Sequence, residues 1–184
     1  DVCKTRVMPR RYSWAIAAGL CLASACTPDP DVAPIDELDL PTGLAQSPDG
    51  RWLFVTNGNW DRSNSASSLI ALDLEALESG MLEPRAAGAE LDRERPCRTH
   101  ADDPGRVECA SAALLDPELG VRLPSGAGNI AIDRPAGDDG PLRLLIPTRI
   151  EPTVAWVDVF GPSFGAPAGS SEPLRFECGQ NHRR

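Results

Sequence analysis

The sequence is poor in histidine and has no hydrophobic run of membrane-spanning length, and each deficit excludes a class of protein. Its main apolar stretch, Trp14 to Ala25, is shorter than the about 20 residues that a transmembrane helix needs. We therefore expect no permanent membrane span. The two histidines, His100 and His182, lie in polar segments, which disfavours a histidine-assisted catalytic site. The haem signature C-x-x-C-H and an EF-hand loop are also absent from the sequence. The sequence thus predicts no metal, no cofactor and no enzyme.

Positive charge is also scarce. The chain has 18 Lys and Arg against 27 Asp and Glu, which gives a formal net charge of −9. An acidic surface repels phosphate backbones and anionic lipid headgroups. The charge balance therefore excludes a nucleic-acid partner, and membrane association has to come from a covalent lipid.

The N-terminal part of the sequence has the order of features that an export signal requires. Arg10 and Arg11 give a positive start, Trp14 to Leu22 form an apolar segment, and Ala23 to Ala25 are small enough for a signal peptidase. We take Met8 as the start of translation. Residues 1–25 are thus predicted to be an upstream extension and a signal peptide.

The end of this leader, Leu22-Ala23-Ser24-Ala25-Cys26, resembles a bacterial lipobox, although Ala23 stands where the family most often has leucine. The resemblance implies cleavage before Cys26 and diacylglycerol on its thiol. It therefore implies a membrane partner and a lipoprotein of the cell envelope, on the outer membrane or the periplasmic face. The alternative is an ordinary A-x-A site, which leaves a soluble secreted protein with unmodified Cys26.

Residues 26–37 are rich in Pro and Asp, which predicts a flexible tether before a folded part at 38–184. Export places the cysteines in an oxidising compartment. Cys97 and Cys109 bracket a polar stretch without apolar periodicity, so we predict a disulfide between them, with a stabilisation of about 3 kcal/mol. If Cys26 carries lipid, Cys178 is left without a partner; if it does not, Cys26 can pair with Cys178.

Two parts of the folded region repeat the same pattern of short strand, Gly/Pro/Asp turn, strand, loop and strand. The first copy covers 44–57 and 68–74, and the second covers 130–149 and 153–159. The strands are apolar on both sides of the pleat, and few helical patterns are available to cover them, so sheets must stack on sheets. We expect Trp52 and Trp156 to pack between these sheets. Such repetition predicts an all-β fold, a partial β-propeller of two to three blades, with an insertion at 75–120 or a degenerate blade there.

The first copy carries the residues of a known repeat. Ser47-Pro48-Asp49-Gly50, Phe54-Val55-Thr56-Asn57 and Ile70-Ala71-Leu72-Asp73-Leu74 resemble a blade of the YVTN-type β-propellers, with Phe54 in place of the tyrosine. The resemblance implies blade architecture only, since this family includes lactonases, redox-enzyme domains and binding scaffolds. We expect a non-catalytic binding or scaffold module with an unknown ligand or protein partner. The main alternative is an exported lactonase-like enzyme.

A closed ring needs at least four blades, so the two to three expected here predict a truncated chain or assembly with other copies. Trp60, in a loop after Asn57-Gly58-Asn59, is a candidate ligand-facing residue, and the alternative is that it covers the core edge. Gly161-Pro162-Ser163-Phe164-Gly165 matches the nucleophile elbow G-x-S-x-G, but the Pro/Gly-rich residues after it cannot form the required helix. We interpret it as a loop.

Overall fold

The computed structural model describes residues 33–60, 64–134, 140–150, 152–165 and 173–178. The leader and Cys26 lie outside this range, so the predictions for them rest on the sequence. Within it, the strands form two four-stranded antiparallel sheets and one two-stranded hairpin. The expected mostly β, antiparallel fold is thus confirmed. No helix among these residues is long and apolar enough to cross a bilayer.

Sheet 1 contains the first predicted copy. Its strands are β1 (Pro41–Gln46), β2 (Trp52–Asn57), β3 (Ser67–Asp73) and β6 (Leu115–Leu123), in the order β1-β2-β3-β6. The turn between β1 and β2 forms where Pro48-Asp49-Gly50 predicted it. Gly50 has a φ of 79°, which a glycine adopts without the steric cost of a side chain.

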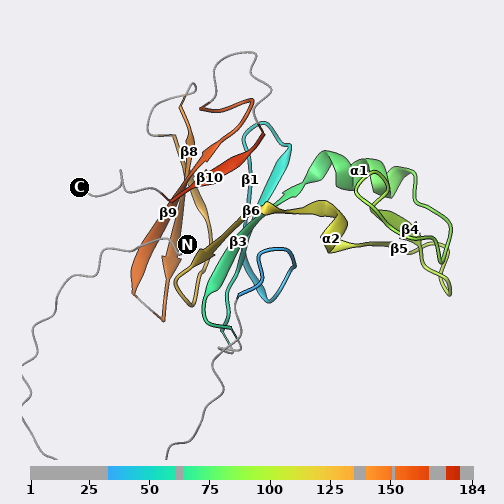
Figure 1. Ribbon diagram of the computed structural model, residues 1–184, viewed down its shortest axis with the longest axis horizontal. Coiled ribbons are helices and arrows are strands. Elements are labelled where there is room, and N and C mark those ends of the chain that lie inside the picture. Colours follow the sequence, from blue (N-terminus) through green and yellow to red (C-terminus); the bar gives the residue numbers. More distant parts are fainter. Residues whose placement is uncertain (1–32, 61–63, 135–139, 151, 166–172, 179–184) are drawn as a thin grey trace, which may run out of the picture.

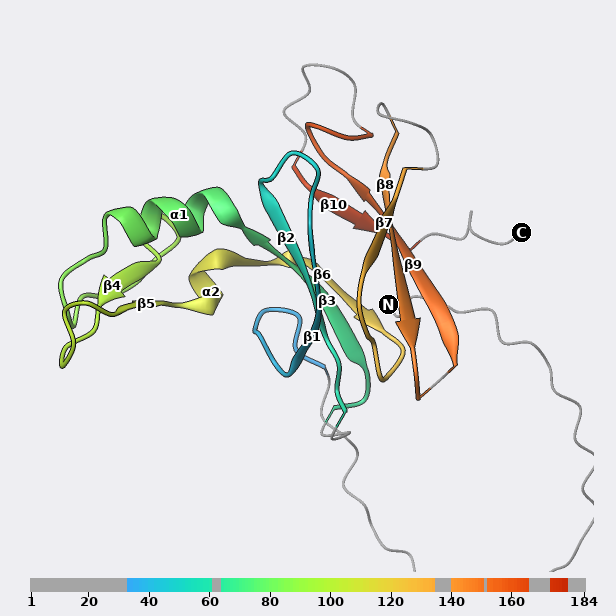
Figure 2. The same ribbon diagram turned by 180° about the vertical axis from the view of Figure 1, so that it is seen from behind.

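Sheet 2 repeats this order with the second copy. Its strands are β7 (Ala131–Asp133), β8 (Leu142–Thr148), β9 (Thr153–Phe160) and β10 (Arg175–Glu177). In each sheet three consecutive strands pair as a meander, and a fourth strand completes the outer edge beside the third. The two sheets lie side by side in Figures 1 and 2.

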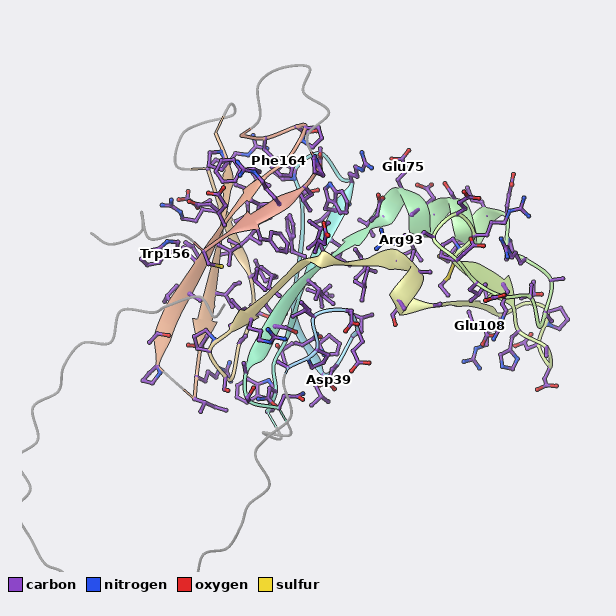
Figure 3. All side chains as sticks on the ribbon, in the orientation of Figure 1. Asp39, Glu75, Arg93, Glu108, Trp156 and Phe164 are labelled. Carbon is purple, nitrogen blue, oxygen red and sulfur yellow. A yellow bond between two sulfur atoms is a disulfide. The ribbon has the colours of Figure 1, made fainter. Side chains whose placement is uncertain are left out.

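The main hydrophobic core lies between the two sheets. Phe54, Leu69 and Ala71 of sheet 1 face a row of fully buried aliphatic residues on sheet 2, which is Leu142, Leu144, Ile146, Ala155, Val157 and Val159. Since successive strand residues point to opposite faces, Trp156 lies on the face of β9 turned away from sheet 1 (Figure 3). The expectation that Trp156 packs between the sheets is therefore wrong, whereas Trp52 does pack at the edge of this core.

Strands β1 and β2 of the first copy closely approach the segment that leads into β7 of the second. Thr42 Oγ1 donates to the carbonyl oxygen of Ala127 at 2.7 Å, and Thr56 Oγ1 donates to that of Gly128 at 2.8 Å. A Cβ on Gly43 would lie 2.4 Å from the Gly128 oxygen. Only glycine therefore fits at position 43 without displacing one of the two backbones.

The segment between β3 and β6 forms an arm that projects from sheet 1 away from sheet 2 (Figures 1 and 2). It contains helix α1 (Leu74–Leu82), the hairpin of β4 (Cys97–Thr99) and β5 (Val107–Cys109), and the short helix α2 (Ser111–Leu114). The sequence showed few helical patterns and predicted an insertion at 75–120 without assigning a helix to it. Residues from Leu115 onward instead pair with β3 and complete sheet 1.

The arm and the N-terminal segment cover the outer face of sheet 1. A second core cluster joins Val55, Ile70 and Leu72 of the sheet to Leu114 and Leu115, which explains why β3 is apolar on both faces. Ala33 is also buried, and Ile35 packs on Gly120. The last residues of the expected tether, 33–37, therefore belong to the folded part.

Candidate functional site

The predicted disulfide between Cys97 and Cys109 is present, and the two residues are directly opposite each other on β4 and β5. Helix α1 packs on it through Gly80, where a Cβ would lie 2.9 Å from Cys97 Sγ. The disulfide thus packs between α1 and the hairpin, and Cys109 also contacts the cluster that joins the arm to sheet 1.

Cys178 is also disulfide-bonded. Its predicted partner in the form without lipid, Cys26, lies outside the described residues. Of the two states predicted for Cys178, unpaired when Cys26 carries lipid and bonded to Cys26 when it does not, the bonded one agrees with this structure.

Trp60 lies at the end of the sheets where the β2–β3 and β8–β9 loops meet. Its side chain is 43% exposed, and the guanidinium of Arg149 lies over the ring, 5.3 Å from its centroid. One ring face is thus used for a contact between the two copies. Ligand binding by Trp60 stays a prediction, and a ligand could contact only the part of the ring that Arg149 leaves exposed.

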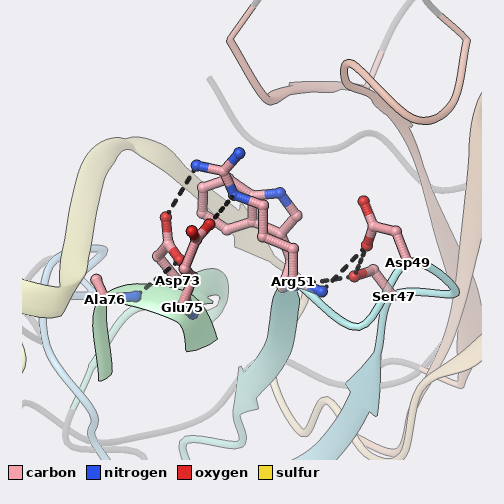
Figure 4. Close-up of polar contacts among 7 residues, drawn as sticks. Ser47, Asp49, Arg51, Asp73, Glu75 and Ala76 are labelled. Carbon is pink, nitrogen blue, oxygen red and sulfur yellow. Dashed lines mark hydrogen bonds and ion pairs between the residues drawn. The ribbon is translucent and has the colours of Figure 1, made fainter. Parts of the chain in front are cut away.

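In both copies an arginine binds the aspartate of the third strand, and this arginine lies in β8 of sheet 2 and directly before β2 in sheet 1. Arg143 donates through Nε and Nη2 to the two carboxylate oxygens of Asp158, at 2.8 and 3.1 Å. This bond raises the pKa of Arg143. In sheet 1 Arg51 Nη2 donates to Asp73 Oδ2 at 3.3 Å (Figure 4). The two aspartates therefore have equivalent structural roles, each binding an arginine of its own sheet.

Asp73 has a second role, because it is the N-cap of α1. Its Oδ1 accepts hydrogen bonds from the backbone N–H groups of Glu75 and Ala76, at 3.0 and 3.2 Å. Such caps stabilise a helix start by about 1 kcal/mol. The sequence signal for α1 was thus present at Asp73, although the strand pattern obscured it.

The turn between β1 and β2 contacts the G-x-S-x-G loop through a hydrogen bond between Asp49 and Ser163. Partial burial would raise the pKa of Asp49, but hydrogen bonds from Ser47, the Arg51 backbone and Ser163 outweigh it and lower the pKa. Around Ser163 the chain makes a tight turn, with two backbone hydrogen bonds between Gly161 and Phe164. Phe164 is 3% exposed and belongs to the main core. This arrangement agrees with the interpretation as a loop.

A half-open cavity of about 180 Å³ lies where the arm leaves sheet 1, and we call it the Trp52 pocket. It forms where the pairing of β3 with β6 becomes irregular, between Ile70 and Leu72. Its walls come from both sheet 1 and the arm. Most of them are apolar: Trp52, Ala76, Ala113, Leu114, Leu115 and Leu119.

Two charged residues, Asp73 and Arg93, also line the Trp52 pocket. The carboxylate of Asp73 is already bonded to Arg51 and to the start of α1. Arg93 Nη2 donates to the carbonyl oxygen of Leu115 at 3.5 Å, and Figure 3 shows Arg93 beside sheet 1 at the base of the arm. The pocket can therefore bind an apolar group, whereas both charges are engaged within the protein.

The described residues contain no group of three or more His, Cys, Asp or Glu side chains placed to hold a metal ion. The sequence predicted the disulfide and the packing of Trp52 between the sheets, but it did not predict the pocket. Arg93, Ala113 and Leu115 are far from Trp52 in the sequence, and no spacing rule relates them.

The chain matches no protein-family model, no curated protein and no solved structure. Its function therefore has to be inferred from the leader, the repeated sheets and the Trp52 pocket.

Proposed function

We propose that this chain is a cell-envelope lipoprotein whose folded part is a β-propeller-type, non-catalytic binding module. The leader supports export, and the lipobox resemblance supports anchoring through Cys26. Two sheets of identical strand order, each with its Arg–Asp pair, support propeller-type repetition. The module uses its arm, rather than a catalytic centre, as its working part.

The observation that carries the binding role is the projecting arm. Its shape is held by the Cys97–Cys109 disulfide and by α1 packed on it. At the end of α1 the apolar residues Met81 and Leu82 are 54% and 75% exposed. A rigid element that presents apolar side chains to solvent is suited to contact another protein.

The anchoring is tested by expressing the chain from Met8 in a bacterium and analysing the mature protein by mass spectrometry. We expect the protein in the membrane fraction with a diacylglyceryl group on Cys26. The Cys26→Ser variant should be released into the soluble fraction. An unmodified Cys26 in the mature protein would refute the anchor.

The binding role is tested by photo-crosslinking in the cell envelope, with a crosslinking residue at Leu82 or, as a control, at Leu44. Both leucines are exposed, at 75% and 62%, but only Leu82 lies on the arm. We expect a distinct crosslinked partner from position 82 that is absent from position 44. Identical products from the two positions would argue against recognition by the arm.

A second candidate is a soluble secreted module with a Cys26–Cys178 disulfide, and the disulfide-bonded state of Cys178 favours it. Lipid and disulfide exclude each other because both use the Cys26 sulfur. Peptide mapping without reduction distinguishes the candidates, since a peptide that joins Cys26 to Cys178 appears only in the secreted form.

A further inference from the structure

The Trp52 pocket has the size of one amino-acid side chain. Pockets for whole small-molecule ligands usually measure about 300–1,000 Å³, whereas an apolar cavity of about 150 Å³ is enough for benzene. With a volume of about 180 Å³, the Trp52 pocket is close to the benzene-sized cavity and smaller than a usual ligand pocket. It can take a leucine-sized or phenylalanine-sized group but not a cofactor.

The walls favour an apolar group over a cation. Leu115 and Leu119 are 1% and 7% exposed and form an aliphatic wall, and Trp52 adds an aromatic one. The Asp73 charge is balanced by Arg51 at 3.3 Å. A cation placed here would lose its hydration, and the Asp73 carboxylate would not compensate because it is already paired with Arg51, so cation binding is unfavourable.

The repeat shows that the pairing of the second and third strands does not require a tryptophan opposite the aspartate. In sheet 2 the residue opposite the recurring Asp158 is Arg143, which bonds to it. In sheet 1 the residue opposite Asp73 is Trp52, and the bonding arginine is its neighbour Arg51. The first copy thus places an indole at the base of the arm, and Arg51 stacks on that ring at 5.2 Å.

We propose that the Trp52 pocket binds one neutral apolar side chain, of the leucine or phenylalanine type, presented by a partner polypeptide. This inference rests on the proposed function as a protein-binding module. It adds the place where the partner is anchored, between the arm and sheet 1. A single buried apolar anchor surrounded by weaker contacts is how many protein interfaces gain most of their affinity.

The test is an NMR titration of the full chain with N-acetyl-leucinamide and N-acetyl-phenylalaninamide, with N-acetyl-lysinamide as the charged comparison. We expect saturable shifts of the Trp52 indole N–H and of the Leu115 and Leu119 methyl groups. The lysine probe should bind at least about tenfold more weakly, because its ammonium loses hydration. Equal shifts with all three probes, or no saturable shift, would overturn the proposal.

Two neighbouring alanines of α2 provide a matched pair of variants. Ala113 lines the pocket, whereas Ala112 is exposed to solvent. Ala113→Leu should fill the cavity and weaken binding of the leucine probe at least about tenfold, whereas Ala112→Leu should leave it within about twofold. If Ala113→Leu does not fold, Ala76→Leu fills the pocket from α1. Full binding by a folded, filled variant would refute the site.

The outcome separates this inference from the proposed function. If the Leu82 crosslink forms but the probes do not bind, only the pocket assignment fails. If the probes bind but no partner is crosslinked and Cys26 carries no lipid, the pocket stands and the envelope module fails.

Discussion

At the scale of single residues, the close approach of the backbone at Gly43 to that at Gly128 and Asn129 determines which side chains fit at position 43. Gly43 lies against Gly128 and Asn129, and an added Cβ would meet backbone atoms at 2.4 and 2.8 Å. Neither neighbour is the end of a flexible side chain that can move away. The contact between β1 and the segment before β7 therefore depends on the absence of a side chain at position 43.

Gly43→Ala should accordingly lower the free energy of unfolding by about 1–3 kcal/mol, the usual cost of overpacking. Urea denaturation measures the change. Gly105→Ala is the control, since its Cβ would meet only Asp103 Oδ1 at 3.4 Å. Equal stability of the two variants would contradict the close approach.

Asp49 should give stability a defined pH dependence. Its folded-state pKa lies below the ordinary value of 3.8. The ionised form is thus favoured by folding, and the stabilisation is complete above about pH 4 and lost as the pH falls through the lowered pKa. Asp49→Asn should cost at most about 1 kcal/mol at pH 7, because Asp49 is exposed.

Urea denaturation at pH 7, 4 and 2.5 checks this expectation. The difference between the wild type and Asp49→Asn should shrink between pH 4 and 2.5. A difference that stays constant or grows toward acid would show that the carboxylate of Asp49 is not the stabilised group.

At the scale of elements, the arm is a unit whose order depends on one covalent bond. Its helix α1 is amphipathic over little more than two turns, and its hairpin has three residues in each strand. Elements this short are marginal without tertiary support. The disulfide supplies that support at their common centre.

The double variant Cys97→Ser/Cys109→Ser should therefore loosen the arm and leave the sheets folded. We expect a local loss of about 3 kcal/mol, seen as faster hydrogen exchange in α1, β4 and β5. Exchange in β2 and β8 of the same sample is the internal reference. The variant is preferable to a reducing agent, which would also act on the disulfide of Cys178. Unchanged exchange in the arm would disprove the dependence.

The sequence was sufficient to predict the three strands of each copy, because apolar runs and turn signals specify them locally. These strands are β1, β2, β3, β7, β8 and β9. The sequence was insufficient for β6, whose Asp116, Pro117 and Gly120 are typical of a loop. β6 is a strand because it pairs with the open edge of β3, which is a tertiary effect. Helix α1 was readable from its Asp73 cap, whereas the Trp52 pocket was not, since its walls meet only after folding.

At the scale of the whole molecule, the two sheets depend on one shared core. The main hydrophobic cluster contains buried residues of both sheets. Each sheet therefore relies on the other to shield its inner face from water. Thr42 and Thr56 add hydrogen bonds across the contact. We expect the pair to unfold as one cooperative unit.

Leu144→Ala should test this cooperativity, since Leu144 is fully buried between the sheets. The cavity should cost about 2–5 kcal/mol, and hydrogen exchange should accelerate by similar factors in β2 and β8. Leu44→Ala, at a leucine that is 62% exposed, should cost less than about 0.5 kcal/mol. Acceleration confined to β8 would mean that the sheets unfold separately.

The position of the arm inside sheet 1 also determines the order in which the chain can assemble. Strands β1, β2 and β3 can pair as soon as they leave the ribosome or the export channel, but β6 follows only after the whole arm. Until then the outer edge of β3 has unpaired backbone groups that attract other chains. A long free segment makes the return of β6 less probable, and an early Cys97–Cys109 bond shortens that segment. Oxidation of the arm should therefore hasten the completion of the sheet and protect the nascent chain from aggregation.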